Sequence, residues 1–431
     1  PFVTGIFPLG GKAGAKTRVE IRGWNLPAAS RVQDERGKAA GVHPVSVRIG
    51  EWSSNAAPFA VDTLPEVSAK DGATRREKAQ KVKLPVVVNG RIARAAGQQF
   101  FRIEARAAEE ITAEVWARRL DSPLDSVLRL TDAKGRELAF NDDFTDKGAG
   151  LLTHQADSRI CFRFPARGTY YLQLGDAQRK GGPEYAYRLR IAHPEPGFEL
   201  RLTPSSLNLR AGATVPVTVY ALRRDGFAGE ISLTLKDAPP GFSMSGAAIP
   251  AGQDIVRLTI TAPRTSAGTP AAIQLEGHGT VGGREVRRIA VPAEDMMQAF
   301  FYRHLVPERE WMVRVTGQGV QPVLRAASGK TVKVPAGGTV AVQLSVPPRL
   351  VGDVQFALND PPAGLAVQSV LPAANGVSVV LSASGDQIIP GLRGNLILDA
   401  FVERPAPNQG ANGRRKQPVG TVPAIPFEVV R

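Results

Sequence analysis

One short acidic loop holds the residue types that could bind a metal ion. An asparagine and three aspartates lie within six residues, at Asn141, Asp142, Asp143 and Asp146. Calcium takes about six to eight oxygen ligands, and one loop can supply carboxylates, an amide and main-chain carbonyls. The loop does not match the EF-hand pattern, and a solvated turn in which these side chains cap their own backbone explains it as well. We favour the turn, and calcium is the one cofactor that the sequence suggests.

Aromatic rings on the surface are the second candidate site, because sugar-binding sandwiches stack pyranose rings on them. Tyr170 and Tyr171 are consecutive in a stretch with strand character, so their side chains must point to opposite faces of a sheet. Trp52 lies beside a polar Ser-Ser-Asn run. We therefore expect one of the two tyrosines, or Trp52, to present a ring to a ligand, whereas Tyr187 alternates with core residues.

Catalytic motifs give no credible site. Residues 10–17, GGKAGAKT, approach the phosphate-binding loop but have Ala15 at the second glycine position, and a strand follows where that loop needs a helix. The patterns HExxH, GxSxG and SxxK give no credible catalytic site either, and the five histidines are scattered along the chain. Paired carboxylates for glycoside hydrolysis are conceivable, but nothing places them across a cleft. We expect no catalytic residue.

The charge of the chain is basic but evenly distributed. Lys and Arg number 54 against 40 Asp and Glu, a net charge of +14, and each part of the chain shares this excess. Nucleic-acid binding needs positive charge gathered on one face, so we expect no nucleic-acid partner. Acidic polymers such as cell-surface polysaccharide are a second interpretation of the excess.

The single cysteine and the apolar runs also limit the function. Cys161 excludes an intramolecular disulfide and a cysteine-based metal cluster, and alternation within residues 159–164 suggests a buried structural thiol. No apolar run approaches the roughly 18 residues of a membrane span, and no signal peptide is recognisable. Because the chain begins with Pro1, we expect a processed product or a fragment of a longer protein.

Length and composition predict several β domains. At roughly 100–150 residues a domain, 431 residues give three or four compact units. Hydrophobic residues make up 43% and charged residues 22%, which is globular composition. The 44 glycines and 34 prolines follow no Gly-X-Y period and are typical of many turns between short strands. We predict an all-β string of Ig-like and jelly-roll-like sandwiches with very little helix.

The first segment, residues 1–67, has the order strand, glycine turn, strand and then Gly23-Trp24-Asn25-Leu26. Over residues 3–27 this resembles the IPT/TIG domain, and the resemblance implies a small Ig-like sandwich of secreted and cell-surface proteins. The next residues, 68–83, are polar and predict a solvated linker.

The second segment, residues 84–195, carries four motifs at LDSVLRL 124–130, NDD 141–143, DSR 157–159 and GTYY 168–171. Together they resemble the bacterial pre-peptidase C-terminal domain. The resemblance implies a jelly-roll-like sandwich that exported bacterial proteins carry as an accessory unit. This chain has AKDG at residues 69–72, where that family often has an acidic Glu-Pro-Asn stretch.

The last two segments, residues 196–293 and 321–431, form an internal repeat. Residues 209–217 align with 334–342, and residues 229–235 align with 352–358. This pattern predicts tandem Ig-like sandwiches. Between them lies a connector, residues 294–320, whose apolar residues fall at helical spacing before Pro307. We therefore expect one or two helical turns between Glu294 and Leu305.

These patterns together favour a non-catalytic, exported, multidomain β protein. We expect it to serve adhesion, spacing, or binding to extracellular polysaccharide or another cell-surface component, and to be secreted, periplasmic or on the cell surface. One alternative is an accessory region of a larger secreted enzyme whose catalytic domain lies outside this chain. Another is a hydrolase with a cryptic carboxylate site.

Overall fold

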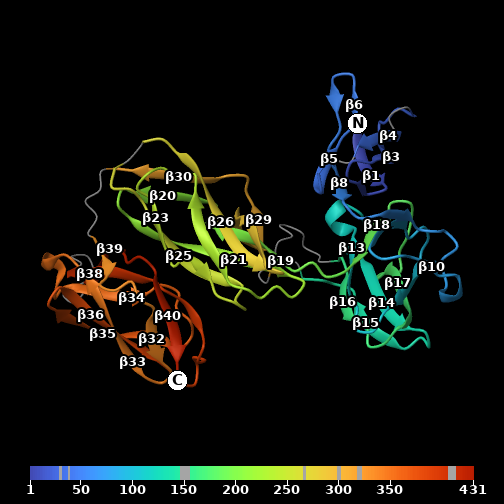
Figure 1. Cartoon of the computed structure of the whole chain (residues 1–431). Coiled ribbons are helices and arrows are strands. Elements are labelled where there is room, and N and C mark those ends of the chain that lie inside the picture. The colour runs from blue at the N-terminus through green and yellow to red at the C-terminus, as the bar shows by residue number, and fades with distance from the viewer. Residues whose placement is uncertain are drawn as a thin grey trace. The chain divides into compact units, whose positions relative to one another are not determined.

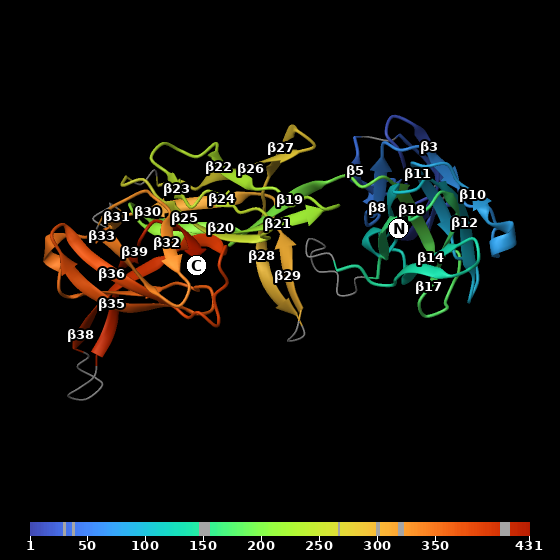
Figure 2. The ribbon, with the colours of Figure 1, turned by 60° about the horizontal axis from the view of Figure 1, so that its bottom comes forward.

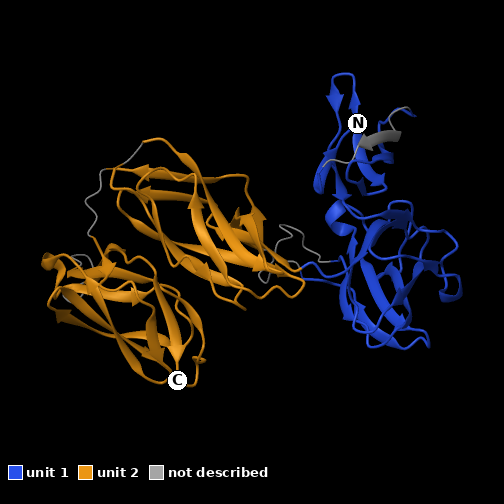
Figure 3. Cartoon of the chain, viewed as in Figure 1, with its two compact units in different colours: residues 1–195 blue, residues 196–431 orange. Residues whose placement is uncertain are grey.

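The computed structural model describes residues 1–28, 32–36, 39–145, 156–265, 268–298, 302–317, 323–405 and 414–431. These residues form strands and turns, as Figure 1 shows, and the helical elements among them are short 3-10 turns such as η3 (Arg118–Leu120) and η4 (Pro348–Leu350). The predicted all-β fold is therefore confirmed. The chain divides into two compact units, residues 1–195 and 196–431, which Figure 3 colours separately.

The first sandwich of the first unit has two sheets and a small hairpin. The sheets have the strand orders β1-β3-β4 and β2-β8-β5, and β6 pairs with β7. In β3 the buried Val19 and Ile21 alternate with partly exposed polar residues, which is why this segment forms a half-buried strand. The strands are β1 (Phe2–Phe7), β2 (Gly10–Lys12), β3 (Lys16–Trp24), β4 (Val32–Arg36), β5 (Gly41–Val45), β6 (Arg48–Ile49), β7 (Trp52–Ser53) and β8 (Ala57–Asp62).

The second sandwich packs two five-stranded sheets, ordered β10-β12-β17-β14-β15 and β16-β13-β18-β11-β9. Its core lies between them and includes the fully buried Phe101, Leu128 and Tyr187. The strands are β9 (Glu66–Ser68), β10 (Gln80–Lys81), β11 (Val86–Arg91), β12 (Gln98–Ala105), β13 (Glu110–Trp116), β14 (Ser126–Asp132), β15 (Glu137–Asn141), β16 (Arg159–Arg163), β17 (Gly168–Asp176) and β18 (Ala186–Ala192).

The expected solvated linker at residues 68–83 is instead attached to the second sandwich. Its strand β10 pairs in parallel with β12, and β9 just before it pairs with β11. The buried Gln80 side chain accepts a hydrogen bond from Lys70 N at 2.7 Å and donates one to Ser68 O at 3.0 Å. In the 3-10 turn η2 (Arg76–Lys78), Arg76 donates to Asp132 O at 3.1 Å. The strand pairings and the Arg76 bond to the second sandwich could not be inferred from the polar composition of the segment.

The third sandwich, which begins the second unit, has the sheets β23-β25-β21-β19-β28-β29 and β20-β30-β26-β22-β24, and β27 pairs with β26. Its strands are β19 (Gly197–Thr203), β20 (Ser206–Arg210), β21 (Thr214–Arg224), β22 (Ile231–Lys236), β23 (Ser243–Ser245), β24 (Ala248–Ile249), β25 (Ile255–Thr261), β26 (Ala271–Val281), β27 (Arg284–Ile289), β28 (Val291–Gln298), β29 (Tyr302–Pro307) and β30 (Trp311–Thr316).

The predicted helix between Glu294 and Leu305 is wrong. Its described residues, those up to Gln298 and those from Tyr302, lie in the paired strands β28 and β29, visible in Figure 2, in which Met296 pairs with His304 and Glu294 with Val306. Residues 299–301 lie outside the described residues. Strand β28 also pairs in parallel with β19, and β30 pairs with β20 and β26. Non-local pairing thus overrides the helical spacing of the apolar residues, and Met296 and Met297 are exposed. Much of the expected connector is part of the third sandwich.

The fourth sandwich has the strand orders β31-β33-β36-β35, β32-β40-β37 and β34-β38-β39. The sequence repeat is also a repeat of backbone conformation, because Gly212 and Gly337 both have φ of 74° in the turns before β21 and β33. The strands of the fourth sandwich are β31 (Arg325–Ala326), β32 (Val332–Pro335), β33 (Thr339–Ser345), β34 (Val354–Leu358), β35 (Leu365–Ala373), β36 (Gly376–Ala383), β37 (Arg393–Leu396), β38 (Leu398–Pro405), β39 (Arg414–Thr421) and β40 (Ile425–Val430).

Neighbouring sandwiches are joined within the first unit. Leu120 and Ala186 of the second sandwich are buried in the core cluster of the first. Arg91 of β11 donates to Glu20 of β3 at 2.7 Å, and its guanidinium lies 3.7 Å from the centre of the Phe7 ring. The two sandwiches therefore share apolar and polar contacts. None of the helical elements in the described residues has the length and hydrophobicity of a membrane-spanning helix.

Candidate functional site

The acidic loop uses its asparagine to hold its own backbone. Asn141, the last residue of β15, donates through Nδ2 to Asp143 O at 2.9 Å. Its Oδ1 accepts a hydrogen bond from Arg159 N at 2.7 Å, which ties the loop to β16. Asp142 and Asp143 are exposed, and Asp146 lies outside the described residues. With both amide atoms of Asn141 already bonded, this geometry favours the solvated turn over a calcium site.

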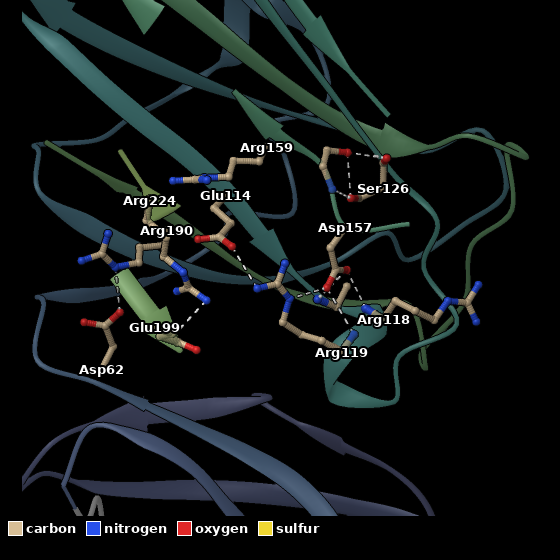
Figure 4. A network of polar contacts seen from close by, with 12 residues as sticks. Asp62, Glu114, Arg118, Arg119, Ser126, Asp157, Arg159, Arg190, Glu199 and Arg224 are labelled. Atoms are coloured by element: carbon tan, nitrogen blue, oxygen red, sulfur yellow. Dashed lines mark hydrogen bonds and ion pairs between the residues drawn. The ribbon is translucent and has the colours of Figure 1, made fainter. Parts of the chain in front are cut away.

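Two further aspartates of the second sandwich, Asp157 and Asp176, are bonded to other groups. Buried Asp157 accepts hydrogen bonds from three consecutive main-chain N–H groups at η3, those of Ala117, Arg118 and Arg119. Figure 4 shows the Arg119 side chain between Asp157, at 2.8 Å, and Glu114, at 2.9 Å. Asp176 accepts from Asp125 N and Lys180 N. Among the described residues no group of three His, Cys, Asp or Glu side chains could hold a metal ion.

Tyr170 does not present a ring to solvent. It is only 5% exposed, its hydroxyl donates to Ala166 O at 2.7 Å, and its ring centre lies 4.4 Å from that of Phe164. Tyr170 is therefore not the exposed ring among the three candidates. Tyr171 points to the opposite face of the sheet, because it follows Tyr170 directly in β17. It is half-buried, and the Arg76 guanidinium lies 4.6 Å from its ring centre. One face of the Tyr171 ring is thus already in contact with a cation.

Trp52 is the predicted aromatic residue that is open to solvent, with 72% of its surface exposed. Two further exposed rings belong to the same sandwich: Trp24 is 71% and Phe2 is 53% exposed. Phe2 and Trp24 are direct cross-strand partners in β1 and β3, so their side chains leave the same face of the sheet. We call Phe2, Trp24 and Trp52 the aromatic end of the first sandwich.

The aromatic end is held by specific main-chain contacts. Trp52 pairs with Ile49 across the turn at Gly50, whose φ of 60° suits a tight hairpin. Just after this hairpin, Asn55 accepts from Val3 N at 2.7 Å and donates to Val3 O at 2.9 Å. These two bonds anchor the base of the hairpin to β1 beside Phe2. Figure 1 shows that the hairpin with β6 projects from the end of the sandwich that also holds the N-terminus.

Close main-chain contact also fixes the Phe2–Trp24 pair. A Cβ atom on Gly23 would lie 1.9 Å from Phe2 O, so only glycine allows β1 to approach β3 here. Trp24 was not among the rings predicted to be exposed, although strand alternation in the sequence indicates its exposure. Alternation places Trp24 on the face of β3 that carries Glu20 and Arg22, opposite the buried Ile21.

Charged groups continue along that outer face toward the second sandwich. The Glu20 carboxylate accepts from Arg22 Nη2 at 2.9 Å and from Arg91 Nη2 at 2.7 Å. The hydrogen bond from Arg91, with a further bond from Arg22, holds the pKa of Glu20 below its ordinary value. The outer face thus combines two aromatic rings with an ionised carboxylate between two guanidinium groups.

Cys161 is exposed rather than buried. In β16 the inward positions belong to Ile160 and Phe162, and Cys161 lies on the opposite face with its Sγ 3.5 Å from Thr112 Oγ1. The alternation was read correctly in the sequence, but the wrong face was assigned to the core.

Comparison with known proteins finds a relative for a small part of the chain. No family model matches it. A stretch of 76 residues is 41% identical to a probable subtilase-type serine protease of Deinococcus radiodurans, and the match covers 17% of this chain and 9% of that protein. The chain thus spans less than a tenth of that relative's length. A solved structure of tandem Ig repeats of Dlar aligns with 56% of this chain and 100% of its own, at 13% identity and a TM-score of 0.20. This TM-score is too low to support an argument, so the fold rests on the strand pairings above.

Proposed function

We propose that this chain is a non-catalytic, exported string of β sandwiches that binds extracellular polysaccharide through the aromatic end of the first sandwich. The observation that carries the proposal is the exposure of Trp24 and Trp52, at 71% and 72%, on well-anchored strands. Exposed tryptophan on a fixed backbone contacts the flat apolar face of a sugar at low entropic cost. Polar side chains nearby, such as Arg22, can bond to sugar hydroxyls.

The test is glycan-array binding with and without calcium, followed by titration calorimetry with each glycan that binds. Single Trp24→Ala and Trp52→Ala variants should each weaken binding about tenfold, since a good aromatic contact contributes about 1–1.5 kcal/mol. Phe140→Ala is the matched control, because Phe140 is 46% exposed but lies in the second sandwich. Wild-type affinity in both tryptophan variants, with the fold intact by circular dichroism, would contradict the proposal.

A second candidate is that the chain is an accessory region of a larger secreted enzyme. The 76-residue match to a probable subtilase-type protease favours it, as does the resemblance of the second segment to the pre-peptidase C-terminal domain. An antibody against this chain should then detect a much larger polypeptide in the culture medium before any processing. Detection of a product no larger than this chain at every stage of export would exclude that origin.

The hydrolase alternative has a simple test of its own. A panel of glycoside, ester and peptide substrates is offered to the wild type and to Asp142→Asn. Turnover that this substitution abolishes would replace the binding proposal with an enzymatic function.

A further inference from the structure

The two sandwiches of the second unit are fastened by hydrogen bonds between named groups. Arg257 of β25 donates to the side-chain Oδ1 of Asn359 at 2.6 Å. In the opposite direction, Asn395 of β37 donates to Gly246 O at 2.9 Å and to Arg257 O at 2.8 Å. The buried Ala424 N donates to Thr259 Oγ1 at 2.8 Å. The third and fourth sandwiches therefore form a defined junction.

A cleft of about 230 Å³ lies at this junction. The third sandwich lines it with the start of β21 and the end of β25, and the fourth with β31, the last residues of β39 and Pro423. Ligand pockets for drug-sized molecules are typically about 300–1,000 Å³, so this cleft suits a smaller group such as one sugar ring. The lining residues that could contact it include Thr214, Thr261, Arg264, Leu324, Arg325 and Thr421.

The cleft is positively charged. Arg264 comes from the third sandwich and Arg325 from the fourth, and both are exposed. No carboxylate is among the described residues that line the cleft, and neither guanidinium has an ion pair with a described residue. An arginine fork matches a carboxylate or sulfate with two parallel hydrogen bonds, so two arginines at one cleft favour an anion.

The rest of the wall suits the ring of a sugar rather than a bare ion. Leu324 and Pro423 supply apolar surface. Thr214 and Thr261 are hydrogen-bonded through their hydroxyls at 2.9 Å, and each hydroxyl retains capacity for a further bond. Ser243 is exposed on the third-sandwich side of the cleft. Apolar wall, hydroxyl groups and arginines together match a pyranose that carries an acidic substituent.

We propose that this cleft binds one acidic sugar unit, a uronate or a sulfated sugar, of an extracellular polysaccharide. The inference extends the proposed function, since it names an acidic class of polysaccharide, but it concerns a separate site in the other unit. The Arg264 and Arg325 guanidinium groups would bind the acidic group, and the hydroxyls of Thr214 and Thr261 would bond to those of the ring.

The test uses the full chain with Trp24→Ala/Trp52→Ala, so that the aromatic end does not contribute. Calorimetric titration compares an oligogalacturonate, a sulfated oligosaccharide, a neutral oligosaccharide of equal length and inorganic phosphate. We expect at least one acidic oligosaccharide to bind with a Kd on the order of a millimolar or tighter. The neutral oligosaccharide and phosphate should bind at least tenfold more weakly.

Two added changes locate the site. Arg264→Ala/Arg325→Ala should weaken acidic-oligosaccharide binding at least tenfold, and Ser243→Trp, which adds a bulky side chain to the cleft lining without changing charge, should do the same. Arg284→Ala/Arg288→Ala is the control, because it removes the same charge from exposed positions on β27.

The outcomes separate the two proposals. If Arg284→Ala/Arg288→Ala weakens acidic-oligosaccharide binding as much as Arg264→Ala/Arg325→Ala does, the attraction is non-specific and the cleft site is overturned. Unchanged binding in Ser243→Trp would also overturn the cleft site. Phosphate binding as tight as that of the acidic sugar would overturn the sugar part of the inference. If only the proposal for the aromatic end is wrong, the Trp24→Ala/Trp52→Ala chain should still bind the acidic oligosaccharide.

Discussion

The hydroxyl of Tyr187 occupies the space that a side chain on Gly90 would need. The two residues are direct partners across β11 and β18. A Cβ atom on Gly90 would lie 2.3 Å from Tyr187 Oη and 2.4 Å from its Cζ. Tyr187 is fully buried, and its hydroxyl has no hydrogen-bond partner within the described part of the chain. Burial raises the pKa of this hydroxyl, so it stays neutral.

This pair gives the first prediction. Gly90→Ala should lower the free energy of unfolding of the first unit by about 1–3 kcal/mol, because the added methyl overpacks the core. Tyr187→Phe should be neutral or stabilise by up to about 1 kcal/mol, because it removes an unsatisfied buried hydroxyl. The measurement is the urea midpoint of each variant. The double variant should recover only part of the loss, since Cζ remains in the way, and a fully restored midpoint would contradict this packing.

Turn chemistry and strand alternation made the fold class predictable, since both are local. The repeat of Gly212 and Gly337 illustrates this, because a turn that needs positive φ selects glycine wherever it recurs. The hairpin β28–β29 was not predictable in this way. Its strand character depends on pairing with β19, about 90 residues earlier, and spacing alone cannot separate a helix from a strand there.

The candidate site was predicted only in part, and for a related reason. Alternation tells which residues share a face, but it does not tell which face packs against the second sheet. Cys161 was therefore assigned to the wrong face, and the exposed member of the pair Tyr170 and Tyr171 could not be chosen, whereas Trp52, beside a polar run, is exposed as expected. Recognition of Trp24 required the observation that it pairs with the exposed Phe2.

The second prediction concerns Asp157, which accepts hydrogen bonds from three main-chain N–H groups and from Arg119 Nε. Asp157→Ala should destabilise the first unit by about 2–4 kcal/mol, because it leaves these donors unsatisfied next to an unpaired guanidinium edge. Asp157→Asn keeps one acceptor oxygen and should cost less. Thermal unfolding measures both. Asp142→Ala, at an exposed position, is the control, and an equal loss there would contradict this role for Asp157.

The third prediction is that the acidic loop stabilises the second sandwich without calcium. Asn141→Ala should cost about 1–2 kcal/mol in calcium-free buffer, because it removes the bonds to Asp143 O and from Arg159 N. A calcium titration of thermal unfolding should leave the Tm of the wild type unchanged. A concentration-dependent rise that is lost in Asp142→Asn/Asp143→Asn would instead establish a metal site.

The last prediction is a pH dependence at Glu20, whose side chain is 41% exposed. Because its pKa is lowered in the folded state, its ion pairs stabilise the protein above the unfolded pKa, near 4.5. This contribution should disappear as the pH falls through the folded-state pKa. At this exposure solvent screening limits it to about 1 kcal/mol. Glu20→Gln should therefore lower the urea midpoint at pH 7 but not at about pH 2, and less in high salt.

Two arginine variants identify which partner matters more for Glu20. The bond from Arg91 to Glu20 is the shorter of the two, at 2.7 Å against 2.9 Å for Arg22, so Arg91→Ala should reduce the difference between the wild type and Glu20→Gln more than Arg22→Ala does. A double-mutant cycle on urea midpoints measures each coupling energy. Because Arg91 also contacts Phe7, its single substitution should cost additional stability that the cycle removes. A coupling of Glu20 to Arg22 larger than that to Arg91 would show that the bond between the two sandwiches is the weaker one in solution.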